Sequence, residues 1–190
     1  MLIYGGGAWS YAHDPDFTSV STSVDFWQGV IDEYYKKYSG IEKWHRLLLD
    51  TVKKQGYLEI PSGRFYEFQP VLKKQGWKWP ETQIKNYPVQ GFGADLVMLA
   101  RIKARELVRA LGVQADFIQT VHDSLVLDTP EENVYNICVA LKEAVESVPR
   151  MCYDYFGYEF GLPLTCEIQV GKNKLEMTEW VTHENNKENT

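Results

Sequence analysis

Apolar and polar residues follow one another along the first half of the chain with the spacing of helices and short strands. Apolar and aromatic residues recur at helical intervals over 24–38 and again over 41–55, which predicts two helices. Two short strands around a Pro-Ser-Gly turn are predicted over 57–68. Residues 69–85 have neither period, and we expect an irregular linker there.

The second half of the chain has longer patterns. A long helix is predicted over 89–111. Two apolar, β-branched runs within 116–128 predict a tight hairpin, because only the three residues His122 to Ser124 separate them. A helix over 130–148 and a strand over 163–170 are expected next. This mixture of helices and short antiparallel strands predicts an α+β fold.

The composition is that of a globular protein. The chain has 190 residues, of which 44% are hydrophobic and 24% charged, so disordered, collagen-like and coiled-coil classes are excluded. This length suits one domain or one lobe of something larger. Twenty basic and 26 acidic residues give a net charge of −6. Taken by itself, that charge argues against binding to phosphates, because affinity for nucleic acid usually depends on Lys and Arg.

Cysteine usage and hydropathy indicate an intracellular protein. Cys138, Cys152 and Cys166 form no CxxC pair, and three cysteines make a poor disulfide framework, so we expect reduced thiols. No apolar run approaches the roughly 18 residues that cross a bilayer, and no membrane partner is expected. The N-terminus lacks both a basic region and an apolar core, so no signal peptide is expected. The expected compartment is the cytoplasm.

The tip of the predicted hairpin is the first candidate for chemistry. A carboxylate held at the end of a sheet, as Asp123 would be, can bind a hard divalent cation such as Mg²⁺ through oxygen. The neighbouring His122 can donate to a phosphate oxygen. The same dipeptide occurs at His13-Asp14, but there it precedes Pro15 in a turn without flanking strands. The local sequence leaves two interpretations open, a catalytic Asp123 or an ordinary turn residue.

The start of the predicted long helix is the second candidate. Asn86 suits a helix cap and Pro88 a first turn. Asn86 and Gln90 lie four residues apart, so their amides face the same way if this turn is helical. Amides can read the minor-groove acceptors of DNA. Gly91 and Gly93 would let another surface approach closely, although a capped helix with small packing residues explains the same segment.

Two basic features are ambiguous in the same way. Four cations lie opposite the apolar positions of the long helix, where they form either a solvated face or phosphate contacts; these are Arg101, Lys103, Arg105 and Arg109. Arg64 at the first hairpin turn allows both interpretations too. The Gly-rich segment 5–7 is not followed by a phosphate-loop motif, and neither a Ser/His/Asp arrangement nor zinc-ligand spacing occurs.

Taken in order, five segments resemble the C-terminal part of family A DNA polymerases, the bacterial DNA polymerase I type. Together they extend over roughly residues 1 to 176, and five ordered segments are far more specific than any one of them. They are Leu2-Ile3-Tyr4-Gly5, similar to the end of a fingers-helix motif; Tyr34 to Gly63-Arg64, similar to F…YP…a…GYv.T..GR; Asn86 to Gly91 with Ala94-Asp95-Leu96, similar to N.PVQG..AD; Val121-His122-Asp123 with Leu125-Val126, similar to VHDELV; and Val170-Gly171 to Leu175, similar to VG.nW.

The resemblance implies a polymerase palm with an antiparallel sheet and a metal-site hairpin, together with helices of the fingers. Residues 1–85 would be fingers-derived helices and a hairpin. Residues 86–182 would form the palm, with the long helix and the His-Asp hairpin. Residues 183–190 are expected to be a disordered tail.

The resemblance also implies roles for single residues. Tyr4 and Gly5 would lie beside the templating base and the incoming nucleotide. His122 would steady the primer-terminal phosphate, and Asp123 would supply one of two carboxylates that hold a pair of Mg²⁺ ions. DNA contacts would come from Arg64 and, in the minor groove, from the amides Asn86 and Gln90. The implied reaction is attack of a primer 3′-hydroxyl on the α-phosphate of a dNTP.

Three departures from the family pattern change this picture. Ser124 stands where the palm motif usually has Glu, and Thr82 where an Arg often contacts the primer. His-Asp-Ser is also typical of single-subunit phage RNA polymerases. The chain begins inside the fingers motif, so the fingers Lys and Arg and the second metal-binding Asp are absent.

These absences predict a split polymerase, most simply a phage one working in the host cytoplasm. An N-terminal polymerase polypeptide would complete it, and primer-template DNA and dNTP would be its other partners. We therefore expect this chain to be inactive by itself. The alternatives are a fragment of a single-subunit RNA polymerase, a non-catalytic remnant that binds DNA or a replisome partner, and an artificially expressed fragment.

Overall fold

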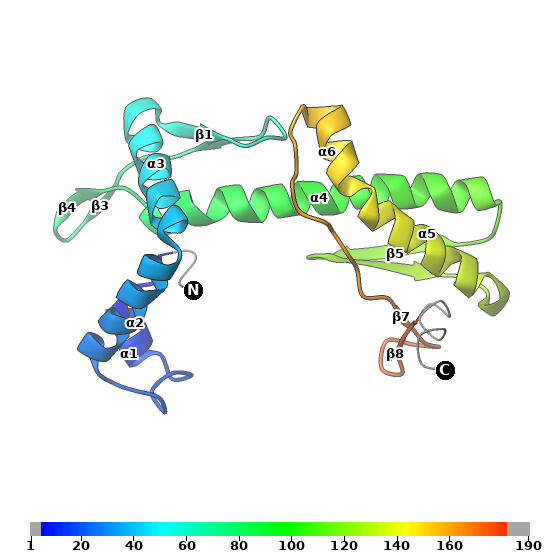
Figure 1. Cartoon of the computed structure of the whole chain (residues 1–190), viewed down its shortest axis with the longest axis horizontal. Helices are drawn as coiled ribbons and strands as arrows, with labels where there is room; N and C mark the ends of the chain where they lie inside the picture. The colour runs from blue at the N-terminus through cyan, green and yellow to red at the C-terminus, as the bar shows by residue number, and fades with distance from the viewer. Residues whose placement is uncertain (1–4, 182–190) are drawn as a thin grey trace. The chain divides into compact units, whose positions relative to one another are not determined.

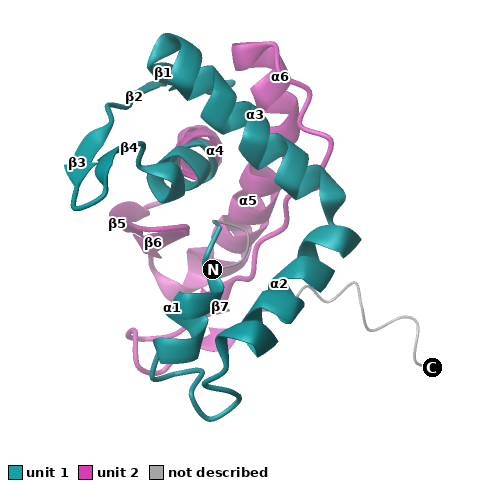
Figure 2. Ribbon diagram, turned by 90° about the vertical axis from the view of Figure 1, so that its left-hand side faces the viewer, with its two compact units in different colours: residues 1–92 teal, residues 93–190 magenta. Residues whose placement is uncertain are grey.

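The computed structural model describes residues 5–181, and within it the chain divides into two compact units, residues 1–92 and 93–190 (Figure 2). The boundary falls within a 31-residue helix, α4. Helices alternate with four separate two-stranded antiparallel sheets (Figure 1), which confirms the α+β class.

The first unit begins with a small helical cluster. It contains α1 (Ala8–His13) and α2 (Val24–Lys37). The helix α2 begins where predicted, because the Ser23 hydroxyl accepts a hydrogen bond from the backbone N–H of Phe26 at 3.2 Å. Tyr11 of α1 stacks on Trp27 of α2 with ring centroids 5.2 Å apart, and this pair forms the centre of the cluster.

A second cluster in this unit joins α3 (Ser39–Gln55) to the hairpin of β1 (Tyr57–Glu59) and β2 (Phe65–Glu67). Gly56 ends α3 in the left-handed conformation, with φ of 84°, directly after the predicted last residue 55. The core of this second cluster is apolar. Its residues come from α3, β1, the position after β2 and α4; they are Val52, Leu58, Phe68 and Ile84.

The segment predicted to be an irregular linker is in fact ordered, and that prediction was wrong. It holds a second hairpin, β3 (Val71–Lys73) and β4 (Gly76–Lys78), followed by the start of α4 (Glu81–Leu111). Strands of three residues are too short to produce a recognisable alternation. The hairpin turn is possible because Gly76 adopts φ of 100°, which favours glycine.

The long helix begins at Glu81 rather than at Val89. Its first turn forms as the backbone N–H of Ile84 donates to the Pro80 carbonyl at 3.0 Å. Pro88 therefore lies inside the helix, and Asn86 is not its cap. The fully buried Ile84 holds this first part of α4 in the core, which compensates for the backbone hydrogen bond that Pro88 cannot donate.

The second unit contains the predicted hairpin, β5 (Asp116–Val121) and β6 (Ser124–Asp128), and two helices, α5 (Val134–Glu146) and α6 (Val148–Phe156). A 3₁₀ turn, η2 (Glu131–Asn133), precedes α5. The prediction of a single helix over 130–148 is thus only partly correct, because this segment consists of η2, α5 and the start of α6. Pro149 has no N–H to continue α5 and instead opens α6, for which it is well suited.

The predicted strand over 163–170 is only partly confirmed. Leu164, Cys166 and Ile168 are half-buried while their neighbours are exposed, so the alternation is present. Only β7 (Gln169–Val170) finds a partner, β8 (Thr178–Glu179). Alternation predicts extended backbone, but a ladder needs a second strand beside it.

The structure does not test the predicted division into fingers and palm or the predicted disordered tail. The assignment of residues 1–85 to fingers and 86–182 to palm remains a prediction. The tail 183–190 lies outside the described residues. Within residues 5–181, no helix combines the length and apolar character that crossing a membrane requires.

Candidate active-site hairpin and nucleic-acid interface

The β5–β6 hairpin presents His122 and Asp123 at its tip. Val121 pairs with Ser124, so these two residues form the whole loop, and both are exposed. The hydroxyl of Ser124 donates to the Val121 carbonyl at 2.9 Å and closes the loop. Ser124 therefore has a structural role at the position where the family motif usually carries an acid.

The backbone of this tip is unusual. Among residues 5–181, His122 is the only residue other than glycine with a positive φ, at 51°. Two-residue hairpin loops favour a positive φ at their first position, and His is among the residues that tolerate it. Such a conformation costs on the order of 1 kcal/mol or more and persists where the surroundings enforce it. The two-residue loop therefore accounts for the positive φ of His122.

The opposite end of the hairpin is anchored. The cross-strand pair Phe117 and Leu127 packs against the core around Val108 of α4 and Ile137 of α5. The Thr129 hydroxyl also donates to the carbonyl of Gln114 at 2.7 Å, which closes this end. The hairpin is therefore fixed at its base and presents its tip to solvent.

A contact from the C-terminal part of the chain reaches the middle of β5. The Lys174 ammonium donates to Gln119 Oε1 at 2.6 Å, although 55 residues separate the two. Next to Gln119 the register shifts, leaving Ile118 without a partner on β6. Sequence reasoning missed this contact, because the two residues lie 55 positions apart and no local pattern links them.

A groove of about 800 Å³ runs along β6 in the same unit, and Asp123 stands among its lining residues. Its walls come from α4, β6, α5 and the extended segment before β7, and they are largely aliphatic; examples are Leu96, Val97, Leu125, Leu141 and Ile168. The candidate acid thus lies where a polar tip meets an apolar groove.

The amide pair lies on α4 in the first unit. Because α4 is helical through both residues, Asn86 and Gln90 stand one turn apart, as the hypothesis required. Gln90 is exposed. The Asn86 Oδ1 is buried without a hydrogen-bond partner among the described residues. Leaving a buried acceptor unpaired carries a desolvation cost.

The two glycines that follow behave differently. A Cβ on Gly91 would lie 1.5 Å from the hydroxyl of Tyr66 on β2, whereas a Cβ on Gly93 would meet nothing within 4 Å. The close approach predicted from the sequence is thus made at Gly91 by the chain's own Tyr66. The ring of Tyr66 also lies 5.8 Å from that of Tyr87, so Gly91 belongs to an aromatic cluster beside the amides.

The other predicted contact residues lie in the first unit as well. Arg64 is exposed at the end of the β1–β2 turn, where Gly63 adopts φ of 79°. Gly5 has φ of 76°, and a Cβ there would lie 2.9 Å from Lys85 Nζ. Tyr4 lies outside the described residues. Sequence reasoning missed Lys85, which pairs with Glu81 at 3.4 Å.

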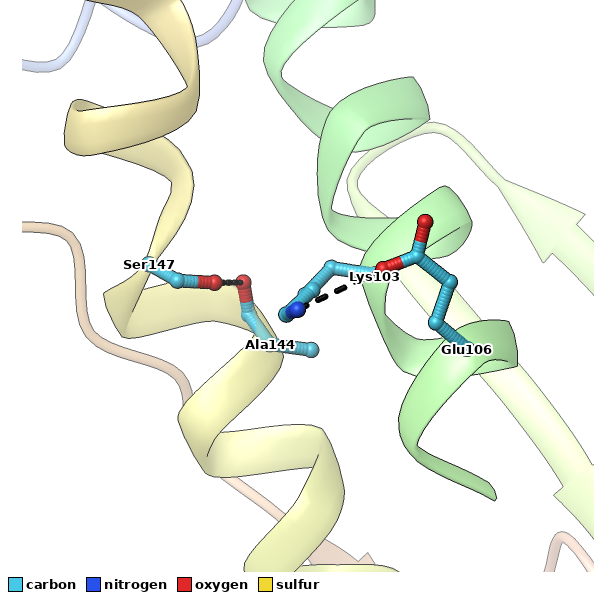
Figure 3. A network of polar contacts seen from close by, with 4 residues as sticks. All are labelled: Lys103, Glu106, Ala144 and Ser147. Carbon is cyan, nitrogen blue, oxygen red and sulfur yellow. Dashed lines mark hydrogen bonds and ion pairs between the residues drawn. The ribbon is translucent and has the colours of Figure 1, made fainter. Parts of the chain in front are cut away.

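The basic face of α4 is partly neutralised within the chain. Lys103 pairs with Glu106 of the same helix at 3.3 Å (Figure 3). Nearby, the Ser147 hydroxyl donates to the Ala144 carbonyl at 2.9 Å and helps to end α5 (Figure 3). For Lys103 the solvated-face interpretation therefore fits best.

Asp123 does not belong to a cluster of metal-ligating side chains among the described residues. Among residues 5–181, no three side chains of His, Cys, Asp or Glu gather closely enough to hold an ion. Asp123 is therefore a single exposed carboxylate, whose oxygens are of the kind that a hard cation binds.

Comparison with known proteins begins with the fold. The structure aligns with the POL domain of Pol1 from M. smegmatis, solved in complex with DNA primer-template and dNTP. The TM-score is 0.70 at 21% sequence identity, over 86% of this chain and 27% of that one. The α+β arrangement is therefore that of a polymerase module.

Sequence comparison identifies the family. The model of DNA polymerase family A matches residues 1–176. The DNA polymerase of Bacillus phage SP01 is 26% identical over 90% of this chain and 19% of its own length. The thermostable DNA polymerase I of Thermus aquaticus is 30% identical over 80% of this chain and 17% of its own. The chain belongs to DNA polymerase family A and spans less than a fifth of these two relatives.

Proposed function

We propose that this chain supplies the C-terminal palm and part of the fingers of a template-directed DNA polymerase. The reaction would be attack of a primer 3′-hydroxyl on the α-phosphate of a dNTP. The observation that carries the proposal is Asp123, an exposed carboxylate at the tip of an anchored hairpin, in a chain that matches family A over residues 1–176. The M. smegmatis relative was solved with primer-template and dNTP, which supports the same ligands here.

Asp123 would hold Mg²⁺ as one of its carboxylate ligands. A pair of such ions, when bound, stabilises the attacking and leaving oxygens of an in-line displacement. The short loop fixes the backbone position of Asp123, and its carboxylate oxygens suit a hard cation. Its neighbour His122 would donate to the primer-terminal phosphate, and the positive φ at His122 sets the direction of that side chain.

The first unit would contribute contacts to the nucleic acid. Asn86 and Gln90 stand one turn apart on α4, and Gln90 is exposed. Their amides would contact the minor groove near the primer terminus. Arg64 would contact the DNA, and Tyr4 with Gly5 would lie beside the templating base and the nucleotide.

A second polypeptide would complete the site. One carboxylate does not hold two ions, and the described residues offer no cluster of ligands around it. An N-terminal polymerase chain would carry the other Asp and the fingers Lys and Arg that grip the triphosphate. The chain described here would then be inactive by itself.

Primer extension with Asp123→Asn tests the proposal. In a mixture of the chain with its N-terminal partner, this substitution should lower the rate by at least about 100-fold, because a metal ligand is lost. Asp116→Asn changes the same charge at the anchored end of the same hairpin and should leave the rate unchanged. Equal activity of Asp123→Asn and the wild type would refute the catalytic role. Extension by this chain without any partner would refute the split.

The same mixture separates the alternatives. Ser124 gives the sequence His-Asp-Ser, which favours a single-subunit RNA polymerase as the second candidate. Incorporation of rNTP in preference to dNTP would establish it. A non-catalytic DNA-binding remnant would keep its DNA affinity in Asp123→Ala and show no extension in any mixture.

A further inference from the structure

The β3–β4 hairpin combines exposed aromatic and basic side chains in a chain whose net charge is −6. It carries Lys73, Lys74 and Lys78, and no Asp or Glu occurs between Glu67 and Glu81. None of the three lysines is ion-paired to a residue of the described chain. Figure 1 shows the hairpin projecting to one side of α3 and of the first part of α4.

The register of the two strands separates these side chains onto two faces. Leu72 lies directly opposite Trp77, so the two share one face, and they are 69% and 70% exposed. No aromatic ring among residues 5–181 stacks on Trp77. A tryptophan this exposed presents a flat apolar ring to whatever approaches.

The lysines occupy the other face and the turn. Lys73 and Lys78 lie on the face opposite Trp77 and line a hollow of about 480 Å³ with Trp79 and Thr82. Lys78 also donates a hydrogen bond to Gln75 in the turn, beside Lys74. Glu81, the acid at this hollow, is already paired with Lys85 at 3.4 Å. The hairpin therefore keeps a positive surplus.

We propose that the β3–β4 hairpin binds single-stranded DNA, with an unpaired base stacked on Trp77 and backbone phosphates near the three lysines. The ribbon is only two strands wide, with about 5 Å between them. A flexible single strand can therefore pass around its edge, with one base on Trp77 and phosphates farther along the strand near Lys73 and Lys78 on the other face. An aromatic platform flanked by cations is how proteins bind single strands without reading sequence. Stacking requires an unpaired base, so duplex DNA cannot use Trp77 in this way. The choice of DNA over RNA rests on the proposed polymerase function.

Fluorescence anisotropy of the isolated full chain tests the stacking. The probe is a labelled oligodeoxythymidylate of about 20 nucleotides, longer than the roughly 4–16 that one such site covers. Trp77→Ala should weaken binding about 5- to 150-fold, and Trp77→Phe should keep most of it. Trp9→Ala removes another exposed tryptophan, 66% exposed on α1, and should have no effect. An unchanged far-UV spectrum confirms that each variant is folded.

The salt dependence tests the cations. The triple substitution Lys73→Ala, Lys74→Ala and Lys78→Ala should lower the slope of log affinity against log salt by about 2. The matched double variants Lys73→Ala/Lys74→Ala and Lys53→Ala/Lys54→Ala each remove one exposed Lys-Lys pair, and only the first should weaken binding.

Several outcomes would overturn the inference. The first is that the wild type does not bind the oligodeoxythymidylate. The second is an equal loss of affinity in Trp77→Ala and Trp9→Ala, or in the two Lys-Lys double variants. The third is that Trp77→Ala weakens binding to a duplex as much as to the single strand, or that the wild type binds oligouridylate more tightly than oligodeoxythymidylate. Asp123→Asn should bind the single strand like the wild type. Loss of primer extension with intact strand binding therefore bears on the catalytic proposal only.

Discussion

At the scale of single residues, the same amino acid has different meanings at neighbouring positions. Gly91 and Gly93 look alike in the sequence, yet only Gly91 lies against another side chain, the hydroxyl of Tyr66. His13-Asp14 and His122-Asp123 are the same dipeptide, yet only the second closes a two-residue hairpin loop with a positive φ. The surroundings decide which residue is constrained.

The glycine pair allows a direct test. Gly91→Ala places a methyl group where the Tyr66 ring lies, so we expect a loss of about 1–3 kcal/mol in the free energy of unfolding. Gly93→Ala adds the same methyl group in open space on the same helix and should gain up to about 1 kcal/mol, because Ala favours helix. Urea unfolding of both variants measures this. Equal effects of the two substitutions would show that Tyr66 does not press on Gly91.

At the scale of elements, the hairpin that carries Asp123 depends on a short C-terminal loop. This loop, residues 171–177, is built tightly: a Cβ on Gly171 would lie 2.2 Å from the Glu176 carbonyl oxygen, and Asn173 Oδ1 accepts from the Leu175 N–H at 2.9 Å. Its rigidity holds Lys174 in position to donate to Gln119 of β5. The loop therefore braces the strand that leads to the catalytic candidate.

A double-mutant cycle with Lys174→Met and Gln119→Met tests this brace. The hydrogen bond is exposed, so we expect a coupling energy of only about 0.5–1 kcal/mol in urea unfolding. Lys172→Met, in the same loop, should show no coupling to Gln119→Met. A zero coupling for Lys174 would mean that the loop does not stabilise β5. Hydrogen exchange at the backbone amides of Thr120 and Val121 should be faster in Lys174→Met than in the wild type, and unchanged in Lys172→Met.

At the scale of the whole molecule, cysteine thiols and tyrosine hydroxyls that are buried or half-buried make stability depend on pH. Burial raises the pKa of the thiols of Cys138, Cys152 and Cys166 above its ordinary value, and a nearby Lys142 only partly offsets this for Cys166. Burial and neighbouring tyrosines likewise raise the pKa of Tyr11 and Tyr35. In each case the folded state holds its proton to a higher pH than the unfolded state does.

The sign of the pH effect follows from this. The stabilisation is complete below the unfolded pKa values of about 8.5 for Cys and 10 for Tyr, and it is lost as the pH rises through the folded values. The melting temperature should therefore fall progressively above about pH 8.5. Cys152→Ala, which removes the thiol with the smallest exposed fraction of the three, should flatten the early part of this fall. A melting temperature constant from pH 8 to about 11 would contradict the prediction.

The sequence by itself determined the α+β class, the two helices predicted over 24–38 and 41–55 and found as α2 and α3, the β1–β2 hairpin and the hairpin with His122-Asp123 at its tip. These features depend on contacts near in sequence, namely apolar period, caps and turn residues, which a linear pattern records. The ordered motifs also identified the family, because several short matches at compatible spacing are specific together.

Only the tertiary structure decided the rest. The β3–β4 hairpin is too short for a period, and the extension of α4 back to Glu81 depends on burying Ile84 against α3, β1 and the residue after β2. The contact of Tyr66 with Gly91 and that of Lys174 with Gln119 join residues 25 and 55 positions apart. Such contacts arise from the packing of whole elements, and the free energy that fixes them is therefore absent from any local pattern.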